Sequence, residues 1–217
     1  MRVFVTGGTG VIGRHTIPLL KDAGHEVDAP GRVDLDLFDP DAVRAAVAPA
    51  DAVLHLATRI PPPEARGERE GWIENDLLRG ECTPILARAA MDSSAGLFLM
   101  PTVAFVYPAG PSDESTPIRD DLPYYLETAV AAEKVVTGFT GPGRRGIVLR
   151  FGLLYGPDTG SDGPDDSFGS TLEIGDAARA IVAALEAPAG TYNVVADGEP
   201  VSNRLFRQTT GWAPAAA

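Results

Sequence analysis

The sequence predicts an α/β protein built around a doubly wound parallel sheet, and three observations lead to that class. Short apolar runs alternate along the chain with segments whose apolar residues recur at helical spacing. The helical segments run for about 10 to 15 residues, the length typical of a crossover between parallel strands. A glycine-rich turn follows the first apolar run and opens the first helical segment. Right-handed strand–helix–strand units in this order form a parallel sheet with helices on its faces.

Each expected element has a local reason. Residues 3–6 form an apolar run that ends in the glycine turn, and the helix after the turn ends before Gly24. Asp39 followed by Pro40 indicates a helix start, because an acidic N-cap and a proline at the first helical position both favour one. We expect strands at residues 3–6, 25–29, 52–57, 97–100, 147–150 and 191–195, helices at 11–23, 40–48, 73–90, 123–137 and 174–185, and loops at 61–71, 108–122 and 156–169.

Composition limits the classes of function. The chain has 217 residues, 44% of them hydrophobic, which is ample for a core. Its formal net charge of −12 disfavours binding to nucleic acid or to an anionic membrane surface. The single cysteine, Cys82, excludes an internal disulfide and fits a reducing cytoplasm. A strand that begins this early argues against a signal peptide, and no metal-ligand cluster is visible. We therefore expect a cytoplasmic protein with a small-molecule substrate and no metal.

The turn Thr6-Gly7-Gly8-Thr9-Gly10-Val11-Ile12-Gly13 lies where Rossmann-type folds bind a pyrophosphate. Its first glycine permits the tight turn, the second lets the backbone approach the phosphates, and the third lets the helix pack on the sheet. The helix N-terminus adds free N–H groups and a partial positive charge. Residues 1–150 are thus expected to form a Rossmann-type domain that binds a nicotinamide dinucleotide. The expected contacts at the turn are Gly7, Thr9, Gly10, Val11, Ile12 and Gly13.

The glycine spacing resembles the TGxxGxxG signature of the short-chain dehydrogenase/reductase superfamily, and the resemblance continues in order along the chain. The segment that begins Asp36-Leu37 is similar to the family's DLxD, whose first aspartate faces adenine. The strand end Leu56-Ala57-Thr58 resembles the end of vHLAa, which lies under the cofactor. Residues 106–107, 149–157, 174–178 and 192–194 resemble VYG, LRxxxxYGP, HVDDvA and yNV. These four segments mark the extended branch, the NAD-dependent epimerase/dehydratase group.

The choice between NAD and NADP depends on the end of the second strand. NAD enzymes place an acid there, which accepts hydrogen bonds from the ribose hydroxyls. Alignment with the family puts Gly31 at that position and Arg32 beside it. An arginine beside a missing acid suits the 2′-phosphate of NADP. The pattern favours NADP modestly; NAD stays open, because the alternative for Arg32 is a solvated loop arginine.

The catalytic positions depart from the family pattern. The resemblance implies a tyrosine and, four residues later, a lysine on the same helix face. Matching Glu133-Lys134 to the family's aEk puts Tyr125 at the tyrosine position and Ala129 at the lysine position. Lys134 cannot substitute, because nine residues at about 100° each turn it to the far side of the helix. The chain thus resembles the atypical members of the superfamily, which lack YxxxK.

The serine or threonine position is altered as well. Counting back from Tyr107, the usual hydroxyl falls at Val103, with Thr102 one residue earlier. Thr102, Tyr107 and Tyr125 are therefore the polar groups expected near the nicotinamide. The alternative for Thr102 is a β-favouring residue at a strand end, and for Tyr125 a packing role.

Residues 151–217 are expected to form a reduced substrate-binding lobe, packed on residues 1–150 as one unit. The pocket is then open, or completed by a partner chain in a homodimer. The first hypothesis is an NAD(P)-dependent oxidoreductase or epimerase-like enzyme that acts on a small carbonyl or sugar-like metabolite. The alternatives are a redox-silent dinucleotide-binding sensor or regulatory protein, and a non-redox cyclase or isomerase. Ala129 favours these alternatives, whereas the glycine turn and Asp36 favour continued use of the cofactor.

Overall fold

The computed structural model describes residues 1–165 and 169–215, without the side chain of Pro63, and contains a six-stranded sheet in the order β2-β1-β3-β4-β5-β8. All neighbouring strands in this sheet are parallel. Its strands are β1 (Arg2–Thr6), β2 (Glu26–Asp28), β3 (Ala52–His55), β4 (Leu97–Val103), β5 (Arg145–Phe151) and β8 (Gly190–Val194). The predicted α/β class with a doubly wound parallel sheet is confirmed.

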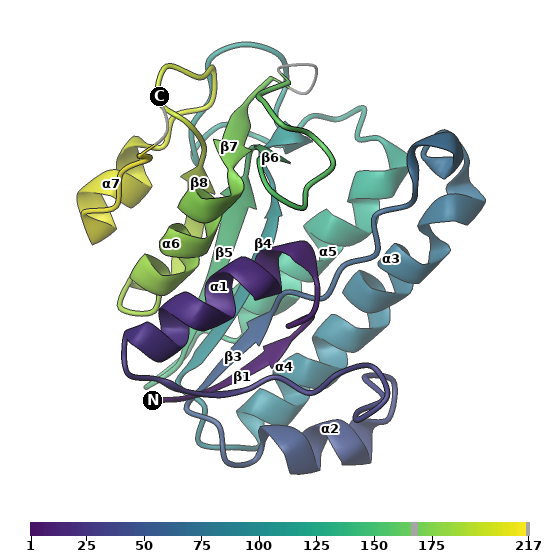
Figure 1. Ribbon diagram of the computed structural model, residues 1–217, viewed down its shortest axis with the longest axis vertical. Helices are drawn as coiled ribbons and strands as arrows, with labels where there is room; N and C mark the ends of the chain where they lie inside the picture. The colour runs from purple at the N-terminus through teal and green to yellow at the C-terminus, as the bar shows by residue number, and fades with distance from the viewer. Residues whose placement is uncertain (166–168, 216–217) are drawn as a thin grey trace.

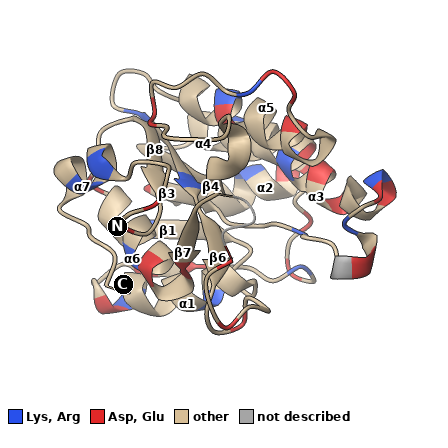
Figure 2. Ribbon diagram, turned by 90° about the horizontal axis from the view of Figure 1, so that it is seen from above, with Lys and Arg blue, Asp and Glu red and all other residues tan. Residues whose placement is uncertain are grey.

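Helices cover both faces of this sheet (Figure 1). They are α1 (Val11–Asp22), α2 (Pro40–Val47), α3 (Ile73–Leu77), α4 (Thr83–Met91), α5 (Tyr124–Gly138), α6 (Ile174–Ala184) and α7 (Arg204–Thr210). Buried side chains of α1, α6 and α7 form one hydrophobic core with the sheet, and those of α2, α4 and α5 form a second. Seen from above, the two groups of helices lie on opposite sides of the strands (Figure 2).

The helix expected over residues 73–90 contains a π-helical turn. α3 ends at Leu77, the turn η3 (Leu78–Cys82) follows, and α4 continues from Thr83. A π turn inserts an extra residue into the helical repeat, and such turns are frequent at functional sites. Arg79 and Cys82 on this turn are both buried. Burial raises the pKa of the Cys82 thiol to about 12, so it stays protonated and acts as a packing residue.

Some elements lie outside the expected pattern. β6 (Leu153–Tyr155) and β7 (Thr171–Glu173) pair with each other beside the main sheet, and three residues are too few to show a period. The loop expected at 61–71 holds the 3₁₀ turns η1 (Pro63–Ala65) and η2 (Arg69–Trp72), and η4 (Ala104–Val106) follows β4. Since β8 pairs with β5, the chain beyond residue 151 returns to the main sheet. In the described ranges, no helix has the length and apolar character needed to cross a bilayer.

Candidate functional site

The glycine turn between β1 and α1 lies directly against the end of β3. Gly7 has a φ of +72°, which favours glycine, and a Cβ at this position would lie 2.6 Å from the backbone nitrogen of Ala57. A Cβ on Gly13 would overlap the carbonyl oxygen of Gly7, and one on Gly10 would lie 3.1 Å from that oxygen. Glycine at positions 7 and 13 is therefore what lets strand, turn and helix meet.

The N-terminus of α1 is open to an anion. No side chain in the described part of the chain caps it, and its first turn has no acidic residue, whereas Asp39 caps α2 and Glu173 caps α6. The first N–H groups of a helix have no partner within the helix, and its dipole places positive charge there. Thr9 is exposed at the turn, and Val11 and Ile12 are half-buried behind it. This arrangement fits the pyrophosphate of a dinucleotide.

The segment after β2 contains a carboxylate that sequence reasoning did not assign. Asp34 Oδ2 accepts a hydrogen bond from Gly31 N at 3.0 Å and lies 3.0 Å from the place of a Cβ on Gly31. An acidic side chain at position 31 would present its oxygens close to this point. Arg32 is exposed, and Asp36 Oδ1 accepts a hydrogen bond from Phe38 N. The sequence comparison considered position 31 alone and missed Asp34, because the sequence pattern does not reveal the turn that brings the Asp34 carboxylate back to Gly31.

Beyond β3 the chain passes beside the glycine turn. Leu56 is buried, Ala57 half-buried and Thr58 exposed, so exposure increases toward the expected cofactor. Leu37 is half-buried against the second core.

His55, the last residue of β3, is held inside the protein. Its Nδ1 lies 2.7 Å from the hydroxyl of Thr6 and its Nε2 3.1 Å from the carbonyl of Leu78. Burial lowers the pKa of His55 to about 4; the Leu78 carbonyl opposes this shift and the charge of Arg79 adds to it. His55 is therefore neutral at neutral pH, as a histidine of the strand core.

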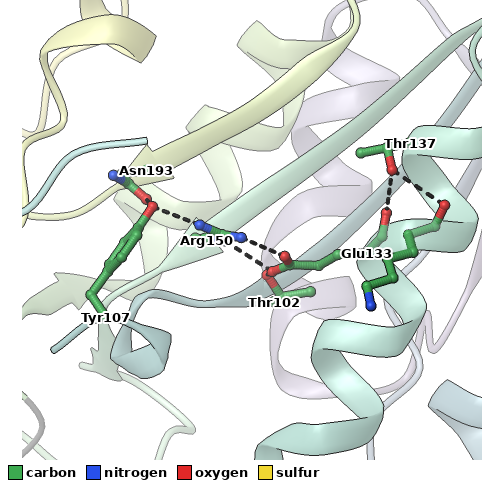
Figure 3. A network of polar contacts seen from close by, with 7 residues as sticks. Thr102, Tyr107, Glu133, Thr137, Arg150 and Asn193 are labelled. Atoms are coloured by element: carbon green, nitrogen blue, oxygen red, sulfur yellow. Dashed lines mark hydrogen bonds and ion pairs between the residues drawn. The ribbon is translucent and has the colours of Figure 1, made fainter. Parts of the chain in front are cut away.

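A buried ion pair joins α5 to the end of the sheet (Figure 3). Arg150 donates from Nη2 to Glu133 Oε2 at 2.6 Å and from Nε to Oε1 at 3.0 Å. Thr102 Oγ1 donates to the same Oε1 at 2.7 Å, and Thr102 faces Arg150 across β4 and β5. Burial opposes the charge on Arg150, but the hydrogen bonds and charge of Glu133 outweigh it and raise the pKa of Arg150. The hydroxyl of Thr102 is thus directed into the interior.

Tyr107 extends this network to β8. Its hydroxyl accepts a hydrogen bond from Arg150 Nη1 at 2.7 Å and donates one to Asn193 Oδ1 at 2.9 Å (Figure 3). Burial raises the pKa of Tyr107 although Arg150 and Asn193 act against the rise, so the phenol stays protonated. One feature of the sequence could have indicated this network: Arg150 stands in an otherwise apolar strand, and an arginine there needs a buried partner.

Tyr125, Ala129 and Glu133 lie four residues apart on α5 and share one face of the helix. Tyr125 is half-buried and stacks on Trp72 with ring centroids 5.1 Å apart. No described residue forms a hydrogen bond with the Tyr125 hydroxyl, in contrast to those of Thr102 and Tyr107. Ala129 is fully buried, whereas Lys134 is exposed.

The loop after β6 closes over the first turn of α1. Asp158, at a φ of +67°, places Oδ2 3.6 Å from Arg14 Nη2 and 3.5 Å from His15 Nε2. Arg14 and His15 directly follow the last glycine of the turn. In the same described ranges, no group of three or more His, Cys, Asp or Glu side chains is placed to hold a metal ion.

A six-stranded parallel sheet with a glycine turn and an open helix N-terminus defines a Rossmann-type nucleotide-binding protein. Residues 3–172 match the model of the NAD dependent epimerase/dehydratase family, and the chain belongs to that family. The resemblance found in the sequence is confirmed.

The proteins that this chain resembles include two reductases from Streptomyces. The chain is 34% identical to a 3-diazoavenalumate denitrifying reductase of a Streptomyces species, over 92% of this chain and 77% of that protein. It is 31% identical to the dTDP-4-dehydrorhamnose reductase of Streptomyces griseus, over 96% of this chain and 75% of that protein. A solved structure with the same fold is a short-chain dehydrogenase/reductase superfamily protein from Agrobacterium tumefaciens with bound NAD. Its TM-score is 0.79 at 21% identity, over all of this chain and 93% of that chain.

Proposed function

We propose that the protein is an NAD(P)-dependent oxidoreductase that reduces a small carbonyl or sugar-like metabolite. The observation that carries this proposal is the intact phosphate turn, where the uncapped start of α1 meets glycines that no larger residue can replace. A bound reduced nicotinamide would supply the hydride. The two named reductases support reduction as the reaction.

The proposed roles of the chain's own residues follow from their contacts. The N–H groups at the start of α1 bind the pyrophosphate, and Asp36 and Leu37 lie at the adenine end. Leu56, Ala57 and Thr58 lie under the cofactor. The hydroxyl of Tyr125, which makes no hydrogen bond to any described residue, donates one to the substrate. Thr102 and Tyr107, expected beside the nicotinamide, instead hold the ends of β4, β5 and β8 in place through Glu133, Arg150 and Asn193.

Cofactor preference depends on two side chains with opposite effects. Arg32 favours the 2′-phosphate of NADPH, because a charge-assisted contact of this kind is worth about 1.5–3 kcal/mol. Asp34, whose carboxylate lies at Gly31, favours the free ribose hydroxyls of NADH and repels a phosphate. NADPH is the proposed cofactor, and Asp34 reduces the preference for NADPH over NADH.

The decisive experiment is a titration with NADH and NADPH by cofactor fluorescence. A screen for single-turnover oxidation follows, with small carbonyls and dTDP-4-dehydro sugars. The Gly10→Val variant should not bind, because its side chain enters the space of the pyrophosphate. Gly67→Val is the control, since no atom of the described residues, its two chain neighbours aside, lies within 4 Å of a Cβ on Gly67. Absence of binding by the wild-type protein would refute the proposal.

The second candidate is a redox-silent dinucleotide-binding protein. Two observations favour it: alanine stands at the lysine position, and the hydroxyl of Thr102 is bonded to Glu133. Tight binding of NADPH without oxidation by any acceptor would support this candidate. Turnover of a substrate with no net oxidation of the cofactor would instead support a cyclase or isomerase.

A further inference from the structure

Arg79 is a buried cation without a direct partner. Its residue is 6% exposed, and no hydrogen bond or ion pair joins its guanidinium to any other residue in the described ranges. Burial lowers the pKa of Arg79 to about 10, although the charges of Glu133 and Asp76 act in the opposite direction. It is therefore still charged at neutral pH. Buried arginines are almost always paired. The guanidinium nitrogens of Arg79 are not among the described atoms that are fully buried without a hydrogen bond, so they keep some contact with solvent and a ligand can reach them.

The neighbouring carboxylates are already engaged. Glu133 uses both oxygens for Arg150 and also accepts a hydrogen bond from Thr102. Asp76 Oδ1 accepts a hydrogen bond from Thr128 Oγ1 at 2.7 Å. Arg79 and Arg150 therefore share this region with two carboxylates, Glu133 and Asp76. Within the described residues, the guanidinium of Arg79 is the one group of these four that makes no hydrogen bond.

The packing of two helices places Arg79 beside α5. The α3–η3–α4 helix and α5 are both crossovers between parallel strands, so they run in the same direction, and η3 packs against α5. The hydrogen bond between Thr128 on α5 and Asp76 on α3 brings these two residues to the same position along the helix axes. The Arg79 guanidinium lies within electrostatic reach of Asp76, which bonds Thr128, and of Glu133, which follows Ala129 by one turn of α5. It therefore lies along the stretch of α5 that contains Ala129.

Ala129 ends at its Cβ and is fully buried. Position 129 therefore contributes no polar group of its own to this face of α5. Tyr125 lies one turn above on the same face of α5, at the edge of the sheet where the proposed nicotinamide binds.

We propose that Arg79 supplies, from the neighbouring helix, the cation that position 129 lacks, and that it binds the nicotinamide ribose of the cofactor. The inference rests on the proposed function, since it assumes that a dinucleotide lies in this site. The guanidinium donates N–H groups to the ribose hydroxyls, for which it has five donors in a rigid fork. It does not relay a proton, because it remains charged, so it takes over only the holding part of a lysine's role.

The test compares Arg79→Met, Arg79→Lys and the double variant Arg79→Met/Ala129→Lys with the wild-type protein. NADH binding is measured by fluorescence, ADP binding by competition, and stability by thermal melting. In Arg79→Met we expect NADH to bind about 10- to 100-fold more weakly, while ADP, which lacks the nicotinamide ribose, binds as before. Arg79→Lys should keep most of the affinity, and the double variant should regain it. Arg88→Met, an exposed position on α4, is the matched control.

Stability separates a ligand-binding role from a structural one. If Arg79 serves an internal ion pair, its replacement should lower the stability of the protein. If it makes no such pair, its replacement should leave the melting temperature unchanged or raise it. Unchanged NADH affinity in Arg79→Met would overturn the inference while leaving the proposed function in place. Equal losses of NADH and ADP affinity together with a lower melting temperature would overturn it as well. If the wild-type protein binds NADPH but not NADH, the same comparison is made with NADPH and 2′,5′-ADP. Absence of binding of both NADH and NADPH would overturn the proposed function, and the inference with it.

Discussion

The Glu133→Gln variant removes the charge from the buried ion pair while keeping the shape of the side chain. In the wild-type protein this carboxylate receives two hydrogen bonds from Arg150 and one from Thr102, at 2.6 to 3.0 Å. Glutamine keeps one acceptor oxygen and turns an NH₂ group toward other donors. Arg150 and Arg79 then lie buried without this counter-ion. Removing one partner of a buried pair costs about 3–5 kcal/mol, and we expect the free energy of unfolding to fall by that amount.

Urea unfolding and thermal melting, both followed by circular dichroism, measure this loss. For a chain of this size each kcal/mol shifts the melting temperature by about 2–4 °C, so we expect a decrease of about 6–20 °C. The control is Glu127→Gln on the same helix, whose pair with Arg69 has side chains 55% and 65% exposed. An exposed pair contributes about 0–1 kcal/mol, so this control should melt close to the wild-type protein.

A Glu133→Gln protein that unfolds within about 0.5 kcal/mol of the wild type would refute this reasoning, because a surface substitution has an effect of that size. A double variant tests its cause. Glu133→Leu/Arg150→Met should be more stable than Glu133→Leu alone, since it no longer leaves Arg150 buried and unpaired. A double variant no more stable than the single one would assign the loss to packing rather than to charge.

Three further predictions concern other residues. Arg32→Ala should weaken NADPH binding about 10- to 100-fold and leave NADH binding nearly unchanged, while Asp34→Asn should raise the affinity for NADPH relative to NADH; equal changes for both cofactors in fluorescence titrations would contradict this. Tyr125→Phe should slow single-turnover oxidation of NADPH by about tenfold or less, because no lysine assists the tyrosine; a thousandfold loss with binding intact would reveal another activating group. The pKa of His55 is about 4 in the folded protein and 6.5 in the unfolded chain, so the unfolded chain binds a proton more readily between these two pH values. The contribution of neutral His55 to the free energy of unfolding is therefore complete above pH 6.5 and is lost as the pH falls toward 4. That loss is about 3 kcal/mol, and His55→Gln should flatten the dependence of urea unfolding on pH in this range; an unchanged slope would count against it.

Much of the fold was predictable because its signals are local. The strand between residues 3 and 6, the glycine turn and the helix after it occur in one run of the chain, and each follows from residue type and spacing. The positions of Tyr125, Ala129 and Lys134 on α5 follow from the helical period in the same way. The three-residue strands β6 and β7 and the π turn at residues 78–82 carry no such signal and were missed.

The sequence accounted for the α/β class, the phosphate turn and the family, because neighbouring residues carry all three. The polar network was decided in the folded protein, where contacts join residues far apart in the chain: Thr102 to Glu133 across 31 positions and Tyr107 to Asn193 across 86. These side chains meet because the sheet order places β4, β5 and β8 side by side, and no local pattern encodes that order. Burial then requires each polar group to find a partner, which commits the hydroxyls of Thr102 and Tyr107 to the interior. Within the described residues, neither the Tyr125 hydroxyl nor the Arg79 guanidinium makes a hydrogen bond, and both environments depend on how η2 and η3 pack beside α5.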